Sequence, residues 1–277
     1  MFRNVSPVLS YKQRIGSSEL RGMKNLVTID KITPSEVSFL RIAGFGACMI
    51  TGYPHEGGGL FDVACALVEK ELSRPIEPKV LSLEGFPAPR AEKYLKSRVF
   101  PFNPDYIVIQ FGSTDAVRPI RAKPRSTGAV SKGRTVYHSP NAFTIARWHI
   151  QSLIGFVWKT APITSLSSYV TAIEHMVNDS ISAEITPVVL SPFIFGSLHS
   201  FKNAADYTNA LRDLNSRVNR MIFIDCIRLL SKAHKSKILL NDGFHLSRLG
   251  HDLIGEAIGQ AIVADIIANE CVGDTRR

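Results

Sequence analysis

Short apolar runs alternate with amphipathic helical patterns along most of this chain, and this alternation limits its fold more than any other feature. The apolar runs, mostly rich in Val, Ile or Phe, are typical of buried strands and lie at 38–44, 79–83, 106–111, 187–190 and 222–225. Helical periodicity is found at 60–72, 91–98, 167–182, 204–221 and 246–269. Strands that alternate with helices predict an α/β fold, with a parallel sheet covered on both faces.

Length and composition fit one α/β domain with an insertion, and two compact domains would also fit. The chain has 277 residues, of which 45% are hydrophobic, enough to bury a sizeable core. Residues 1–38 are polar without a clear period, so we expect an N-terminal arm followed by one domain at 39–277. The interval at about 117–165 is too long for an ordinary strand–helix connection, and we interpret it as an insertion near the site.

The sequence also predicts where the protein is found and which cofactors it lacks. No stretch approaches the roughly 18 uninterrupted apolar residues of a membrane-spanning helix, and the N-terminus has no secretion-signal pattern. The four cysteines are far apart and form no C-x-x-C pair, as expected of reduced thiols. We therefore expect a cytoplasmic protein with no membrane contact, no cofactor and no metal site.

Basic residues are concentrated in the expected insertion. The chain has a formal net charge of +9, and no acidic residue lies between Asp115 and Glu174. That interval contains Arg118, Arg121, Lys123, Arg125, Lys132, Arg134, Arg147 and Lys159. Such a segment attracts phosphate, carboxylate or an acidic glycan, although a solvated surface insertion is the more ordinary explanation. Nucleic-acid binding ranks last, because no recognition motif accompanies the charge.

Candidate catalytic residues follow the predicted strands. Asp242 stands three residues before His245, and a carboxylate at that spacing can orient one imidazole nitrogen while the other acts as a base. Cys48 follows the first strand and is the candidate nucleophile. In an open parallel sheet, ligands bind beyond the carboxyl ends of the strands, so these segments are expected to converge. A packed thiol and a helix-capping Asp with a surface His are the ordinary alternatives.

These residues resemble the sequence blocks of the SGNH/GDSL hydrolase superfamily, which has a three-layer flavodoxin-like fold with a parallel sheet. The resemblance covers roughly residues 41–268 outside the insertion. The first block matches Gly46-Ala47-Cys48 with Gly52, and the second matches Gly85. The third matches Gly112-Ser113-Thr114-Asp115, and the last matches Asp242-Gly243-Phe244-His245. The resemblance thus implies a three-layer flavodoxin-like fold, and the five apolar runs predict its five parallel strands.

The resemblance also implies a role for each residue. Cys48 would attack an acyl carbonyl, and His245, oriented by Asp242, would accept the thiol proton. The backbone amides of Cys48 and Gly85, with Thr114, would form the oxyanion hole. Cys replaces the family's serine, and a cysteine paired with a histidine is a capable nucleophile. Thr114 replaces the family's asparagine, and losing one oxyanion donor costs roughly 10²–10³ in turnover.

The expected function is therefore that of an acyl-ester hydrolase or acyltransferase acting on a small-molecule or glycan ester, such as an acetylated sugar or a lipid. His55, Asp115 and His199 are candidate substrate contacts, and Asp115 could instead orient its loop. The alternative is a catalytically impaired module of the same fold that binds an acidic glycan or another anionic ligand.

Overall fold

The computed structural model describes residues 39–52, 58–117, 129–131, 134–136, 143, 146, 150, 161–193, 198–240 and 245–274. The expected arm at 1–38 and most of the insertion at 117–165 lie outside the described residues. Within the insertion, the short strands β4 (Ala129–Ser131) and β5 (Arg134–Val136) pair in antiparallel fashion. In the part of the chain that is described, no helix is long and apolar enough to cross a membrane.

The predicted five-stranded parallel sheet is confirmed. Its strand order is β2-β1-β3-β6-β7, and neighbouring strands are parallel throughout. The strands are β1 (Leu40–Gly46), β2 (Ile76–Ser82), β3 (Tyr106–Gln110), β6 (Thr186–Leu190) and β7 (Ile222–Ile224). The side chains of the central strand β3 are all buried. Its apolar, mostly β-branched residues therefore pack against helices on both sides of the sheet.

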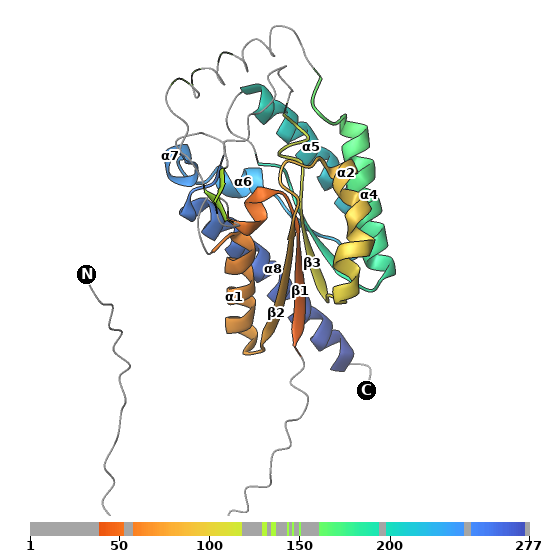
Figure 1. Cartoon of the computed structure of the whole chain (residues 1–277). Coiled ribbons are helices and arrows are strands. Elements are labelled where there is room, and N and C mark those ends of the chain that lie inside the picture. The colour runs from red at the N-terminus through yellow and green to blue at the C-terminus, as the bar shows by residue number, and fades with distance from the viewer. Residues whose placement is uncertain are drawn as a thin grey trace, which may run out of the picture. The chain divides into compact units, whose positions relative to one another are not determined.

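Helices form a layer on each face of the sheet (Figure 1). One layer contains α1 (Leu60–Leu72) and α8 (Arg248–Asp274), and the other contains α2 (Ala88–Ala91), α4 (Leu166–Ser182) and α5 (Leu198–Arg217). Successive residues of β1 supply both cores: Ala43 and Phe45 pack with the α4 side, and Ile42 packs with the α1 side. The short helices α6 (Cys226–Leu230) and α7 (Lys235–Ile238) precede α8.

Helices α1 and α8 approach each other closely. In α8, the apolar residues Ile254, Ile258 and Ile262 recur every fourth position and are fully buried. Gly255 lies where a Cβ atom would stand 2.6 Å from the Leu60 carbonyl oxygen, so no larger residue fits without a shift. This packing fixes the middle of α8 against the start of α1.

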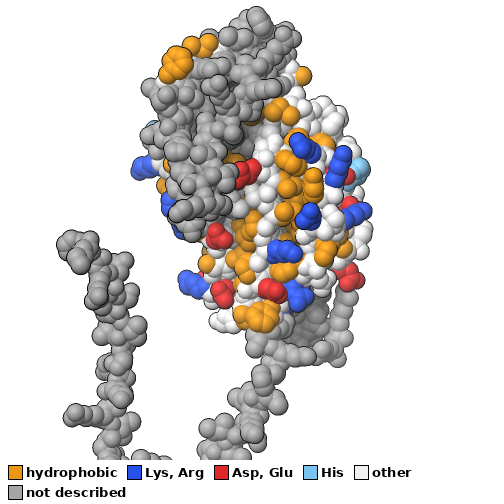
Figure 2. All heavy atoms as spheres, viewed as in Figure 1, with side chains coloured by type: hydrophobic (Ala, Val, Ile, Leu, Met, Phe, Trp, Pro, Cys, Tyr) orange, Lys and Arg blue, Asp and Glu red, His pale blue; other side chains and the backbone are white. Residues whose placement is uncertain are grey.

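The edge strand β2 begins three residues before the predicted strand, at Ile76 instead of residue 79. The apolar pattern does not reveal its first half, because Glu77, Pro78 and Lys79 are all exposed. Proline and lysine are common on edge strands, where they prevent pairing with another chain. Figure 2 shows a band of hydrophobic side chains bordered by Lys and Arg side chains. The ammonium group of Lys79, on this edge strand, lies 5.1 Å from the centroid of the Phe102 ring.

The helical segment predicted at 91–98 is longer and irregular. It begins as α2 at Ala88 and continues through three short helical turns, η2 (Glu92–Tyr94), η3 (Leu95–Val99) and η4 (Phe100–Phe102). Pro87 precedes its first turn, and Pro89 lies within that turn, where a missing N–H costs no helical hydrogen bond. Pro101 then falls in the last turn, and the segment ends at Asn103 in a left-handed conformation.

Candidate active site

Cys48 begins a one-turn helix directly beyond strand β1. This helix, η1 (Cys48–Thr51), is held at its start by Ala47, whose N–H donates to the carbonyl oxygen of Gln110 at 3.1 Å and to its side-chain Oε1 at 3.2 Å. The Thr51 hydroxyl donates to the Cys48 carbonyl oxygen at 3.0 Å. The Cys48 side chain is partly exposed. A short turn fixed by long-range hydrogen bonds therefore presents the candidate nucleophile at the carboxyl edge of the sheet.

Three neighbouring strands end at the same level beside this turn. Gly46 of β1 is in register with Ser82 of β2 and with Gln110 of β3. The Leu83 N–H donates to the Gly46 carbonyl oxygen at 2.8 Å, which joins the ends of β1 and β2. A few residues beyond these ends lie Cys48, Gly85 and Thr114. The structure thus brings the three segments of the predicted oxyanion hole to one edge of the sheet.

Two glycines near Cys48 have left-handed backbone conformations but different surroundings. Gly52 ends η1 at φ +84°, and a Cβ atom there would stand 2.5 Å from the Cα of Gly59. Gly85 has φ +69°, and a Cβ atom there would meet nothing within 4 Å. Backbone conformation therefore explains glycine at both positions, whereas close packing applies only to Gly52.

This difference predicts unequal effects of two alanine substitutions on stability. Gly85→Ala should lower the free energy of unfolding by about 1–2 kcal/mol, the cost of a left-handed conformation with a side chain. Gly52→Ala should cost more, because the new Cβ also collides with backbone atoms. Urea denaturation of both variants measures the difference. Equal losses of unfolding free energy would show that the backbone at Gly59 moves to accommodate the new Cβ atom at no energetic cost.

Asp115 holds the loop after β3. Its carboxylate is fully buried, Oδ1 accepts the Ala88 N–H at 2.9 Å, and Oδ2 accepts the Gly112 N–H at 3.0 Å. Burial raises the pKa of Asp115, while hydrogen bonds from the Thr164 side chain and from these amides act in the opposite direction. Of the two roles considered for Asp115, orienting the loop fits this geometry. Direct contact with a substrate does not, because its oxygens face the protein interior.

Asp115→Asn should therefore destabilise the protein by about 1–3 kcal/mol, because an amide side chain has one acceptor oxygen for two buried N–H groups. Thermal unfolding is the measurement. Asp105→Asn is a matched control, since Asp105 also accepts a backbone N–H, from Arg41 at 2.8 Å, but is exposed. Equal losses in both variants would contradict the special role of the buried carboxylate.

The His245 segment is fixed just before α8. The Leu240 N–H donates to the His245 carbonyl oxygen at 2.9 Å, and the bridge between Leu239 and Leu246 continues this pairing. Ser247 then caps the helix, its hydroxyl oxygen accepting the Gly250 N–H at 3.2 Å. The backbone that carries the candidate base is therefore well ordered by local hydrogen bonds.

The remaining predicted site residues are described only in part. Asp242 and His55 lie outside the described residues. His199 lies in the first turn of α5, and its side chain is also outside them. The pairing of Cys48 with His245 and Asp242 thus stays a prediction.

Gln110 is a site residue that the sequence analysis does not identify. It is fully buried, and its Oε1 accepts the N–H of Ala47, directly before Cys48. The available signal is its position, because it is a polar residue near the end of the otherwise apolar run at 106–111. Its partner lies 63 residues away in the sequence, so only the folded chain reveals the contact.

Comparison with known proteins identifies the architecture. No protein-family model matches the sequence, and no curated protein matches it. Solved structures do match. A lipase/acylhydrolase from Enterococcus faecalis has 18% identity and a TM-score of 0.56, with 81% of this chain and 96% of that chain covered. A G-D-S-L family protein from Desulfitobacterium hafniense has 15% identity and a TM-score of 0.53, with coverages of 80% and 99%.

The chain has the SGNH hydrolase fold. An acetylxylan esterase from Geobacillus stearothermophilus shares this fold with a TM-score of 0.55 and 14% identity, over 81% of this chain and 94% of that chain. The SGNH architecture expected from the sequence blocks is thereby confirmed. At such identities the likeness concerns the fold, and the chemistry must be argued from the residues of this chain.

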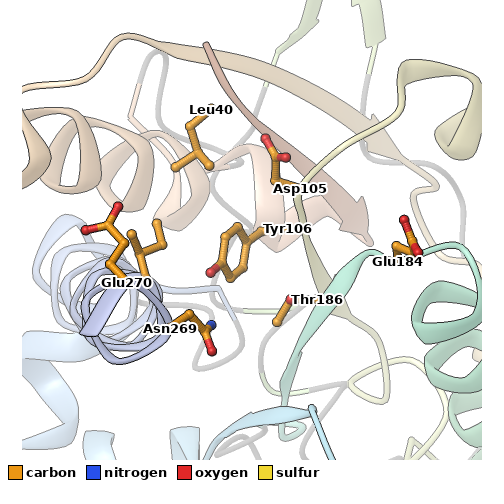
Figure 3. A pocket seen from close by; sticks show the side chains of 8 residues that line it. Leu40, Asp105, Tyr106, Glu184, Thr186, Asn269 and Glu270 are labelled. Carbon is orange, nitrogen blue, oxygen red and sulfur yellow. The ribbon is translucent and has the colours of Figure 1, made fainter. Parts of the chain in front are cut away.

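A pocket of about 370 Å³ lies at the opposite edge of the SGNH sheet (Figure 3). Its lining includes Leu40, Tyr106 and Thr186, the first residues of β1, β3 and β6. The Tyr106 hydroxyl donates to Asp265 at 2.7 Å, and burial raises the pKa of Tyr106. Ligands of open parallel sheets bind at the carboxyl edge, so we assign this pocket no part in the chemistry at Cys48.

Proposed function

We propose that the chain is an acyl-ester hydrolase with Cys48 as nucleophile, His245 as general base and Asp242 as the residue that orients the imidazole. One observation carries the proposal. Three adjacent strands of a fold shared with lipases and esterases end at one level, and Cys48, Gly85 and Thr114 follow them. From these positions a nucleophile and oxyanion donors would reach one acyl carbonyl in the proposed site.

In the proposed reaction, the Cys48 sulfur attacks the ester carbonyl carbon while His245 accepts the thiol proton. The oxygen that becomes negative is stabilised by the N–H groups of Cys48 and Gly85 and by the Thr114 hydroxyl. Collapse of the tetrahedral intermediate expels the alcohol, which takes the proton from His245 and leaves a thioester on Cys48. Water, deprotonated by His245, then releases the carboxylic acid and restores the thiol.

We propose a short acyl ester as substrate, on a sugar or another small alcohol. If an alcohol replaces water in the second half of the reaction, the same site acts as an acyltransferase. The basic segment at 117–165 is proposed as a contact for an anionic group of the substrate.

The covalent step is tested by alkylation and by trapping. Iodoacetamide should label Cys48 faster than the three other cysteines of the native protein. Burial raises the pKa of Cys65 to about 12 and also raises that of Cys226, so both should label slowly. Cys271 is exposed, whereas Cys48 is only partly so, and exposure alone would favour Cys271. Labelling of Cys48 no faster than Cys271 would contradict an activated thiolate.

Intact mass after exposure to a panel of reactive esters completes this test. An acyl adduct on Cys48 reports both the nucleophile and the size of the acyl group.

The second candidate, an impaired module that binds an acidic glycan, is favoured by Thr114, whose side chain is shorter than the asparagine found at this position in the family. That candidate predicts no adduct and no turnover, but saturable, salt-sensitive binding of the glycan.

A further inference from the structure

Arg248 connects the two segments that carry the proposed nucleophile and base. It lies three residues after His245, at the start of α8. Its Nη1 donates to the Gly58 carbonyl oxygen at 3.3 Å, across 190 positions of sequence, and its Nε donates to Asp252 Oδ1 at 2.8 Å. The ion pair within α8 orients the guanidinium, and the longer contact crosses to the turn before α1.

The turn that Arg248 reaches is packed against the Cys48 turn. A Cβ atom on Gly59 would stand 2.4 Å from the backbone nitrogen of Gly52, the residue that ends η1. The N–H groups of Gly58 and Gly59 both donate to Asp62 Oδ2, at 3.2 Å and 3.0 Å, which anchors this turn to α1. Movement of the glycine turn would therefore be transmitted to η1 and to Cys48.

Gly58 has φ +117°, a backbone conformation that favours glycine, and it lies directly against the guanidinium. A Cβ atom there would stand 2.1 Å from Arg248 Nη1, so the guanidinium uses the space that a side chain would fill. The α1–α8 packing at Gly255 lies about two turns further along α8 than the Arg248 contact. The Arg248 contact joins the first turn of α8, beside His245, directly to the glycine turn before α1.

We propose that Arg248 is a positioning residue, which sets the distance between the imidazole of His245 and the thiol of Cys48. The inference rests on the proposed function. Proton transfer between nucleophile and base needs heavy atoms about 2.6–3.2 Å apart, and a misplacement near 1 Å can cost about 10² in rate. A link between the two turns keeps that distance without itself contacting the substrate.

Arg248→Met, which retains length but removes the donors and the charge, tests this role. Turnover of a chromogenic short-chain ester should fall by about tenfold with KM nearly unchanged. Alkylation of Cys48 by iodoacetamide at pH 7 should slow by a similar factor, and its pH profile should move to higher pH. Arg248→Lys should recover part of both rates, since an ammonium can still donate to the Gly58 carbonyl.

Asp252→Asn is the second variant, because it weakens the 2.8 Å ion pair that orients the guanidinium while leaving Arg248 in place. In the Arg248→Met background this substitution should add little, as expected of two residues that act through one contact. Arg212→Met is the matched control. The Arg212 side chain is 53% exposed, against 55% for Arg248, and pairs with Asp225 at 2.6 Å on another part of the fold. It should leave ester turnover and alkylation unchanged.

The outcomes separate this inference from the proposed function. If Arg248→Met and Arg212→Met alkylate at the wild-type rate while the wild type hydrolyses esters, the positioning role is wrong and the function stands. If alkylation of wild-type Cys48 is no faster than in His245→Ala, and no ester is hydrolysed, both are overturned. Fully additive losses in the Asp252/Arg248 double variant would also overturn the proposed link.

Discussion

Cys48→Ala is expected to reduce hydrolysis of a chromogenic short-chain ester by roughly 10³-fold or more, the scale seen when a covalent nucleophile is removed. Alanine leaves the backbone N–H of residue 48 in place, so only the sulfur is lost. The turn should keep its conformation in this variant, because the hydrogen bonds that hold it to Gln110 come from the backbone N–H of Ala47 and not from the Cys48 side chain. The measurement is the initial rate of ester cleavage by folded protein.

Two further variants show whether the loss of ester hydrolysis comes from removing the nucleophile. Cys48→Ser should retain measurable activity, since a hydroxyl at this position can also be activated by His245. Cys271→Ser, at an exposed cysteine near the end of α8, is the control and should match the wild type. If Cys48→Ala hydrolyses the ester as fast as the wild type, the covalent mechanism is wrong.

Thr114→Asn is expected to raise turnover by up to about 10²-fold, the value of one additional oxyanion donor. Thr114 lies in the loop after β3 that Asp115 holds by two backbone N–H groups, and its side chain is partly exposed. A longer amide on this fixed loop would reach further from the backbone than the threonine hydroxyl. The gain should appear in kcat more than in KM, because the oxyanion forms only in the transition state.

Thr114→Val provides the isosteric comparison, because it removes the hydroxyl and keeps the shape. It should lower kcat if the threonine already donates to the oxyanion. No gain with asparagine together with no loss with valine would place Thr114 outside the oxyanion hole.

Local periodicity predicts most of this fold because each element is regular over its own length. The pattern at 60–72 gives the bounds of α1, since its apolar residues repeat at helical spacing. Periodicity misses the first half of β2, where an edge strand needs no buried face. Its limits are also clear at α5, which begins at Leu198, before the expected residue 204, because polar residues in its first turns hide the helical pattern.

The candidate site is predictable where it depends on strand order and unpredictable where it depends on single contacts. Parallel strands carry their carboxyl ends to one edge, so the positions of Cys48, Gly85 and Thr114 follow from the alternation of elements. The contact of Gln110 with Ala47 depends on the register of β1 against β3, which no local pattern encodes. The role of Asp115 likewise depends on Ala88, 27 residues away in the sequence.

The edge strand β2 has a consequence for the behaviour of the protein at high concentration. Pro78 provides no amide hydrogen, and an incoming strand would have to displace Lys79 from the Phe102 ring. Both features oppose the stacking of one molecule's strands onto those of the next, the first step toward fibrillar assembly. The edge of the sheet next to β1 is thereby protected from self-association by the residues of β2 themselves.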